Sequence, residues 1–233
     1  VNGTLCGKHE SMFVPLELDI TDLVRWDSDN ELEVVLDHIP FDQCQYGDSS
    51  LVRTQKSRFA YKWDFCARLI PLGIWQDVEL RAVGNIRCSH VKVTTLLDER
   101  NQSGEVSVHI TPCLPSASQG KAEVRIWKDG KVIAWSSGDF SKDDSWSLVL
   151  SVPNPEIWWP NGFGSHPTYR LEVRLFQADG QLSDEHFTSF GFREIKLVPN
   201  HKAPTGAMPY TFVVNGQPIF IKGFNWVPVD NLY

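Results

Sequence analysis

The hydrophobic residues of this chain alternate with polar ones in short runs, and no stretch of ten or more residues repeats them with the period of a helix. The clearest run covers residues 169–175, in which every second residue is apolar. Turn dipeptides separate the runs, among them Asn215-Gly216 and Asp129-Gly130, and both favour tight hairpins because they tolerate positive φ. Short strands with such punctuation are typical of β-sandwiches and barrels. The sequence therefore predicts an all-β fold.

The runs group into three parts. Residues 1–83 form a first unit, which closes with a clean alternation at 76–83, and Gly84-Asn85 marks its boundary. Residues 84–197 form a second unit, in which six or seven strands fit an immunoglobulin-like sandwich. Residues 198–233 hold a Pro-rich linker, a hairpin and then an apolar strand. Within the second unit, the strands expected from alternation cover residues 91–96, 106–110, 122–127, 146–152 and 169–175.

Composition excludes several classes of function. The net charge is −7 and no basic block occurs, which argues against nucleic acid and anionic membranes as partners. No apolar run approaches the roughly 20 residues of a membrane-spanning helix. We also find no CxxC, HxH, Walker loop, GxGxxG or GxSxG pattern, so we expect neither a metal site nor a cofactor. The sequence leaves the oligomeric state and the cellular compartment open.

Aromatic residues are numerous, with nine Trp and thirteen Phe. Aromatic-rich sandwich cores explain such a content. Sugar stacking is the alternative, because the apolar C–H face of a sugar ring matches an aromatic ring and polar groups around it bind the hydroxyls.

Three stretches carry a specific resemblance: RFAYKWDFCARLIPLGIW at 58–75, IWWPNGFG at 157–164 and NGQPIFIKGFNWVPVD at 215–230. Together they resemble glycoside hydrolase family 2, most closely its β-mannosidase branch. The first stretch departs from the family pattern at Phe65, Cys66 and Ala67, where the pattern has Trp, Gly and Pro. Its matching positions are Trp63, Asp64, Arg68, Gly73, Ile74 and Trp75.

The resemblance implies an architecture. Residues 1–83 correspond to a galactose-binding-like jelly roll, truncated at its start because the chain opens inside a strand-like pattern. Residues 84–197 correspond to the immunoglobulin-like sandwich, and 198–233 to a linker and the first strand of a (β/α)8 barrel. The buried strand expected at 220–230 has no partner in a pair of sandwiches, which favours a barrel.

The resemblance also implies a retaining exo-glycosidase that removes terminal β-mannosyl residues from oligosaccharides. Such enzymes use two carboxyl groups about 5 Å apart. The family carries both as Glu on later barrel strands, beyond Tyr233, so we assign no catalytic residue and expect these 233 residues alone to be inactive. Two alternatives remain. One is a relative with another sugar, namely an exo-β-glucosaminidase, β-galactosidase or β-glucuronidase, and the other is a non-catalytic carbohydrate-binding module.

Four residues are candidates for substrate binding: Trp63, Asp64, Asn225 and Trp226. By resemblance, Asp64 binds a sugar hydroxyl in the −1 subsite, since a carboxylate accepts two hydroxyl bonds at once. The alternative is that Asp64 pairs with a neighbouring cation and only staples its loop. Asn225 and Trp226 fall where the first barrel strand opens onto the substrate face, although Trp226 as a core residue is the alternative. We interpret Trp158-Trp159-Pro160-Asn161-Gly162 as a structural corner, with a sugar platform as the minority interpretation.

Overall fold

The structure of the protein is a computed structural model that describes residues 1–38, 56, 58–62, 67–98, 100, 102–113, 119–141, 145–207 and 209–226. It divides into two compact units, one holding Val1–Glu79 with the residues from Phe224 onward and the other Leu80–Gly223. Apart from a short 3-10 helix at Arg58–Tyr61, every regular element of the described residues is a strand, which confirms the all-β fold. None of these elements is a helix long and apolar enough to cross a membrane.

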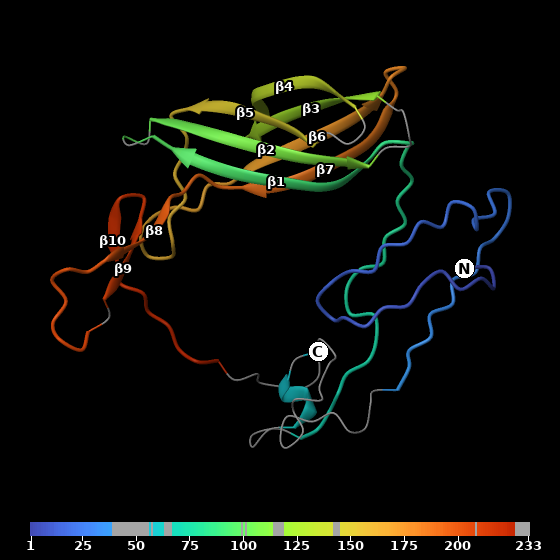
Figure 1. The fold of residues 1–233 in the computed structure, drawn as a ribbon, viewed down its shortest axis with the longest axis horizontal. Helices are drawn as coiled ribbons and strands as arrows, with labels where there is room; N and C mark the ends of the chain where they lie inside the picture. The colour runs from blue at the N-terminus through green and yellow to red at the C-terminus, as the bar shows by residue number, and fades with distance from the viewer. Residues whose placement is uncertain are drawn as a thin grey trace. The chain divides into compact units, whose positions relative to one another are not determined.

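Seven strands of the second unit form two antiparallel sheets that lie face to face as layers (Figure 1). The smaller sheet has the order β1-β2-β5 and the larger one β4-β3-β6-β7. This count and layering confirm the predicted sandwich. The strands are β1 (Arg87–Leu97), β2 (Ser103–Cys113), β3 (Gln119–Lys128), β4 (Lys131–Ser141), β5 (Trp146–Pro153), β6 (Tyr169–Gln177) and β7 (Leu182–Phe190).

Alternating residues of both sheets meet in one hydrophobic core. Phe192, which follows β7 and forms a bridge with Ile157, is completely buried and lies edge-on to Tyr169 with ring centroids 5.1 Å apart. Each such side chain contributes about 1.5–3 kcal/mol through burial. The central strands supply the fully buried aliphatic residues Val106, Val108, Ile110, Val124, Ile126, Leu171, Val173 and Leu175.

A small third sheet of order β10-β9-β8 follows the sandwich, built from β8 (Ile195–Pro199), β9 (Tyr210–Val214) and β10 (Gln217–Ile219). The turn between β9 and β10 has positive φ at both central residues, 50° at Asn215 and 81° at Gly216, as an Asn-Gly hairpin requires. This confirms the predicted hairpin.

The apolar segment after that hairpin is not a strand in its described part. β10 ends at Ile219, and residues 220–226 pair with no other strand. Phe220 and Phe224 are 79% and 80% exposed, so the expectation of a buried strand from residue 220 is wrong for these residues. A lone strand leaves its hydrogen-bonding groups and side chains without a neighbouring layer. Residues 227–230 lie outside the described part, and the barrel start stays a prediction.

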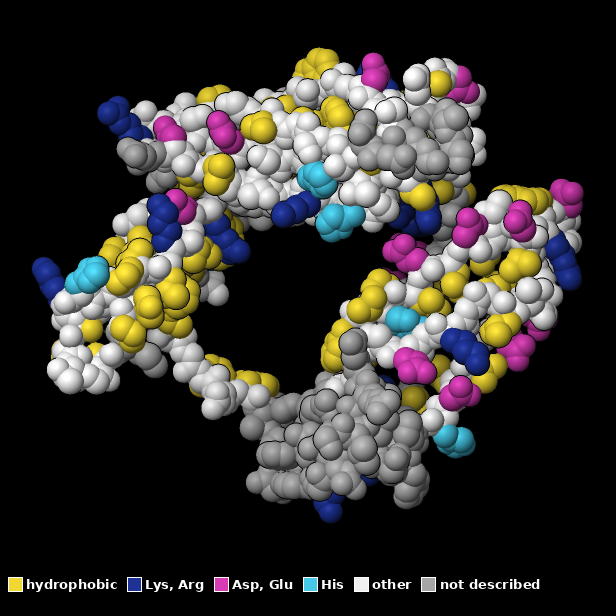
Figure 2. Space-filling view, in the orientation of Figure 1, with side chains coloured by type: hydrophobic (Ala, Val, Ile, Leu, Met, Phe, Trp, Pro, Cys, Tyr) yellow, Lys and Arg dark blue, Asp and Glu magenta, His cyan; other side chains and the backbone are white. Residues whose placement is uncertain are grey.

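The first unit likewise lacks paired strands in its described ranges, 1–38 and 67–79. The alternating runs expected there are present as extended chain, with Leu16, Leu18 and Val34 exposed by 48%, 43% and 52%. Figure 2 shows hydrophobic side chains of this unit open to solvent among acidic ones. An apolar strand face becomes buried only against a second layer. The jelly roll, and the predicted domain boundaries, therefore stay predictions.

Candidate functional site

Two of the four predicted site residues, Trp63 and Asp64, lie outside the described residues. The chain just before them is described: Tyr61 is fully buried, and Lys62 has a φ of 98°. A lysine with positive φ is uncommon, because its Cβ crowds the backbone in that conformation. Such positions concentrate at functional turns. The role of Asp64 stays a prediction.

The other two predicted residues are exposed. Trp226 keeps 70% of its surface accessible, and its ring centroid lies 5.7 Å from that of Phe224. Both interpretations of Trp226, as a pocket residue and as a core residue of the barrel, stay predictions. Asn225 lies beside it, also exposed. Two adjacent solvent-facing aromatic rings are available for contact with a ligand or a covering domain.

The Trp158-Trp159 segment forms a tight corner at the end of the sandwich. The Trp159 amide donates to Ser165 O at 2.9 Å, and the Phe163 amide donates to Pro160 O at 3.0 Å. The guanidinium of Arg193 lies 4.6 Å from the centroid of the Trp158 ring. Because that cation covers the indole, the structure favours the structural interpretation of this corner over the sugar platform.

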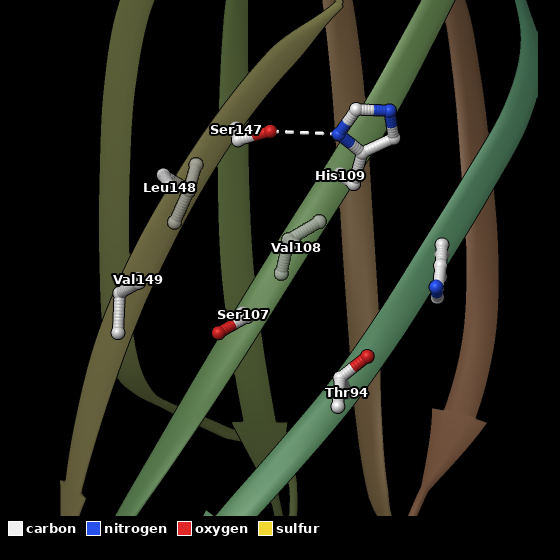
Figure 3. Close-up of a pocket in the computed structure, with 8 residues that line it drawn as sticks. Thr94, Ser107, Val108, His109, Ser147, Leu148 and Val149 are labelled. Atoms are coloured by element: carbon white, nitrogen blue, oxygen red, sulfur yellow. Dashed lines mark hydrogen bonds between the residues drawn. The ribbon is translucent and has the colours of Figure 1, made fainter.

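An open groove of about 630 Å³ crosses the outer face of β1-β2-β5 (Figure 3). Its side chains lie in two rows across the strands. His109 pairs with Ser147, and its Nδ1 lies 2.7 Å from Ser147 Oγ. The residues that line it are Lys92, Thr94, Ser107, Val108, His109, Ser147, Leu148 and Val149. None of them is a carboxylate, so this groove lacks the acid and nucleophile of glycoside hydrolysis.

Sequence reasoning did not single out this groove. The available signal was the outward positions at the middle of the three strands, where small hydroxyl residues lie beside Lys92 and His109. Small side chains leave room over a sheet, and this explains the hollow.

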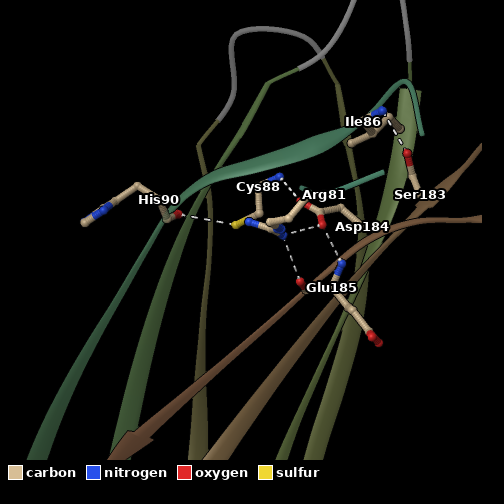
Figure 4. Close-up of polar contacts among 7 residues, drawn as sticks. All are labelled: Arg81, Ile86, Cys88, His90, Ser183, Asp184 and Glu185. Carbon is tan, nitrogen blue, oxygen red and sulfur yellow. Dashed lines mark hydrogen bonds and ion pairs between the residues drawn. The ribbon is translucent and has the colours of Figure 1, made fainter. Parts of the chain in front are cut away.

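A polar network connects residues 81–88, the segment that leads into the sandwich, to β7 (Figure 4). Asp184, whose side chain is 4% exposed, accepts hydrogen bonds from Arg81 Nη2 at 2.9 Å and from the Cys88 amide at 2.7 Å. Next to it, Ser183 Oγ accepts from the Ile86 amide at 2.8 Å. Buried polar groups need such partners, since an unpaired one is costly. This network fixes the path of residues 81–88, close to the predicted boundary.

The network alters two titratable groups. Burial, with a smaller effect of the Asp184 charge, raises the pKa of the Cys88 thiol to about 11. Burial and the nearby Arg81 cation lower the pKa of His186. A thiol with so high a pKa is a poor nucleophile at neutral pH. Within the described ranges no group of three His, Cys, Asp or Glu side chains is arranged to hold a metal ion.

The sandwich matches a known family. Residues 86–193 match Glycosyl hydrolases family 2. Over 99% of its length, the chain is 24% identical to β-mannosidase B of Aspergillus clavatus, of which it covers 28%. The chain is thus similar to glycoside hydrolase family 2 over its sandwich and to β-mannosidases over nearly its whole length.

Two further β-mannosidase relatives agree in sequence and in fold. The mannosylglycoprotein endo-β-mannosidase of Lilium longiflorum is 29% identical over 96% of this chain and 25% of its own length. The crystal structure of the β-D-mannosidase from Dictyoglomus thermophilum superimposes with a TM-score of 0.64 at 25% identity, over 76% of this chain and 22% of that one. The chain thus spans about a quarter of the length of these relatives.

Proposed function

We propose that this β-mannosidase-like chain is part of a retaining exo-glycosidase, which hydrolyses terminal β-mannosyl residues of oligosaccharides. The similarity to a β-mannosidase over 99% of the chain carries the proposal, because it extends well beyond the sandwich on either side. The coarser statement, a glycosidase of this family, follows already from the family match and the β-mannosidase relatives.

The proposal gives these residues a part in binding rather than in acid–base chemistry. Asp64 accepts hydrogen bonds from sugar hydroxyls, and Trp63 supports its loop and the sugar face. Asn225 and Trp226 contribute to the same −1 pocket. A hydrogen bond to a charged group contributes about 1.5–3 kcal/mol. The catalytic Glu pair belongs to barrel strands outside these 233 residues, so the 233 residues alone are inactive under this proposal.

Hydrolysis of a panel of nitrophenyl glycosides tests the proposal. The panel holds the β-mannoside, β-glucosaminide, β-galactoside and β-glucuronide, and the enzyme is the protein made from the whole reading frame. We expect cleavage of the β-mannoside with kcat/KM well above that of the other three. Preferred cleavage of another glycoside would change the proposed sugar specificity but not the glycosidase family. Cleavage of none would favour a non-catalytic carbohydrate-binding module.

The site residues are tested by Asp64→Asn in the same protein. Losing a charge-assisted hydrogen bond of about 1.5–3 kcal/mol lowers kcat/KM on the β-mannoside by about 10- to 100-fold. Asp77→Asn is the matched control, because Asp77 is exposed in the same unit and we expect no change. Equal rates for both variants would remove Asp64 from the site.

An endo-acting β-mannosidase is the second candidate, and one observation favours it. The Lilium longiflorum relative at 29% identity is named a mannosylglycoprotein endo-β-mannosidase. A glycopeptide that carries an internal β-mannosyl linkage, added to the panel, separates the two. Release of an intact oligosaccharide indicates endo action, whereas release of mannose only from a trimmed substrate indicates exo action.

A further inference from the structure

The outer face of the larger sheet carries aromatic and charged side chains in ordered rows. Across one row, Trp135 lies opposite Arg125, and Arg125 lies opposite Glu172. In the next row Trp127 lies opposite Arg170, whose other neighbour is Ser189. Trp135 is 65% exposed, which is unusual for the largest apolar side chain. This face therefore combines flat apolar rings with hydrogen-bonding groups.

An open depression of about 210 Å³ lies at one end of these rows, beside the Asp129-Gly130 turn. Its size is below the 300–1,000 Å³ typical of sites for drug-sized ligands, and suits one small ring. Charges of both signs and the hydroxyl groups of Thr168 and Ser189 surround it, which suits a neutral polyhydroxyl ligand better than an ion. The residues that line it are Trp127, Lys128, Asp129, Gly130, Thr168, Tyr169, Arg170 and Ser189.

The aromatic wall of the depression is held in place from below. Trp127 Nε1 donates to Glu172 Oε2 at 2.8 Å, and Arg125 Nη1 lies 3.7 Å from the same oxygen. Arg125 Nη2 also pairs with Glu123 Oε2 at 3.0 Å. This network occupies the polar edge of the indole. Its apolar face needs no further partner and is preorganised for stacking.

The second wall is a guanidinium with unused donors. Arg170 stacks on Phe187, with its Cζ 4.2 Å from the ring centroid. Within the described part of the chain, its N–H groups have no hydrogen-bond acceptor. Stacking restricts the side chain without consuming those donors, and a planar guanidinium presents them in a fixed fork. Arg170 is therefore ready to bind vicinal hydroxyl oxygens beside Trp127.

We propose that this depression is a saccharide-binding site on the sandwich, which takes one neutral sugar ring of an oligosaccharide. The ring stacks its C–H face on Trp127, and its hydroxyls accept from Arg170 and donate to Asp129. Ser189 and Thr168 complete the polar edge. The site uses none of Trp63, Asp64, Asn225 or Trp226, so it goes beyond the proposed function and is testable apart from hydrolysis.

Calorimetric titration of the full-length protein tests the site, with cellotriose and maltotriose as probes, because the proposed β-mannosidase activity does not consume them. One sugar ring in a shallow site gives weak binding, with a Kd on the order of 1 mM. The variants are Trp127→Ala and Arg170→Ala, and Trp26→Ala is the control because Trp26 is 78% exposed on the other unit. We expect each site variant to weaken binding of at least one probe by about tenfold or more and the control to leave it unchanged.

Three results would overturn the proposal. The first is absence of saturable binding of both probes, and the second is binding that both site variants leave unchanged. The third is protection of Trp127 and Trp135 from acrylamide quenching in the full-length protein, because a covering domain would then occupy the face. Arg170→Ala keeps the test decisive if Trp127→Ala fails to fold, since Arg170 is exposed on the surface. Hydrolysis of the nitrophenyl panel is read separately, so failure of this site and failure of the proposed activity are distinguishable.

Discussion

Arg81 Nη2 donates to Asp184 Oδ1 at 2.9 Å, and this pair joins the segment that enters the sandwich to β7. The two partners differ in environment, because the Arg81 side chain is 54% exposed whereas that of Asp184 is 4% exposed. Asp184 also accepts from the amides of Cys88 and Glu185, at 2.7 and 2.8 Å. The carboxylate is thus the centre of the network, and the arginine is one of three donors to it.

Replacing the centre of this network destabilises the sandwich. Asp184→Ala leaves the partly buried Cys88 amide without its acceptor, at a cost of about 2–4 kcal/mol in the free energy of unfolding. Arg81→Ala costs less, about 1 kcal/mol, because solvent reaches that side chain. Urea unfolding monitored by Trp fluorescence measures both. Asp139→Ala, at an exposed position of β4, is the control and is expected to stay within about 0.5 kcal/mol of the parent. Equal losses for Asp184→Ala and Asp139→Ala would contradict this role.

Cys88 reacts slowly with alkylating reagents. Its pKa of about 11 leaves roughly 0.1% thiolate at pH 8, against roughly 10% for an ordinary thiol, so alkylation is slower by roughly 100-fold. Mass spectrometry of iodoacetamide-treated protein gives the rate for each cysteine, and exposed Cys113 serves as the internal comparison. Asp184→Asn removes a neighbouring negative charge that raises the pKa of Cys88. Faster modification of Cys88 in that variant is expected, and an unchanged rate would argue against the charge effect.

His186 makes the stability of the sandwich depend on pH. Its pKa is lowered in the folded state by burial and by Arg81, so the unfolded chain binds more protons just below pH 6.5. The stabilisation from neutral His186 is therefore fully present above the unfolded pKa and is lost as pH falls toward the folded pKa. Urea midpoints at pH 7.5 and 5.5 measure the change. His186→Gln is expected to lose less stability over this interval than the parent, and an identical loss would exclude His186 as a cause.

The sequence predicted the sandwich well where the inward residues of a strand are apolar and the outward residues are polar. Residues 106–110 and 122–127 lie within β2 and β3, and both Asp-Gly and Asn-Gly turns occur as expected. β7 was harder to predict, because Ser183 and Asp184 are buried while Phe187 is 42% exposed, which inverts the pattern. β4 also departs from the usual pattern, because its apolar residues Val132 and Trp135 are exposed to solvent. A polar network in β7 and an exposed aromatic face in β4 determine which side chains of these strands are buried. Neither feature can be recognised from the periodicity of hydrophobic residues.

The candidate site was predictable only in part. The resemblance selected Trp63 and Asp64, which lie outside the described residues, and Asn225 and Trp226, which are exposed. Alternation gives no information on the −1 pocket, because a pocket is assembled from residues far apart in the chain. The depression beside Trp127 arises in the same way, from strand register between β3, β6 and β7. Register follows from the pairing of strands, which a single sequence does not reveal directly.

Gly104 of β2 is required by the buried ring of Phe192. A Cβ at residue 104 would lie 2.8 Å from Phe192 Cδ1 and closer still to Cε1, and Phe192 is fully buried against Tyr169. Gly104→Ala therefore forces the ring to shift and destabilises the sandwich by about 1–3 kcal/mol. Gly223→Ala is the matched control, since a Cβ there meets nothing within 4 Å.

Asn215 joins the hairpin sheet to the corner of the sandwich. Its Nδ2 donates to Trp158 O at 3.0 Å, and its Oδ1 accepts from the Glu194 amide at 2.8 Å. Asn215→Ala loses both bonds and places Ala at a φ of 50°, whereas Asn215→Gly keeps the turn and loses only the bonds. We expect amide exchange in β9 to accelerate by about tenfold in the glycine variant, for a loss of about 1–2 kcal/mol, and by more in the alanine variant. Exchange that stays slow in both variants would show that β8 pairing alone holds the hairpin, and acceleration in alanine alone would assign the whole effect to the turn.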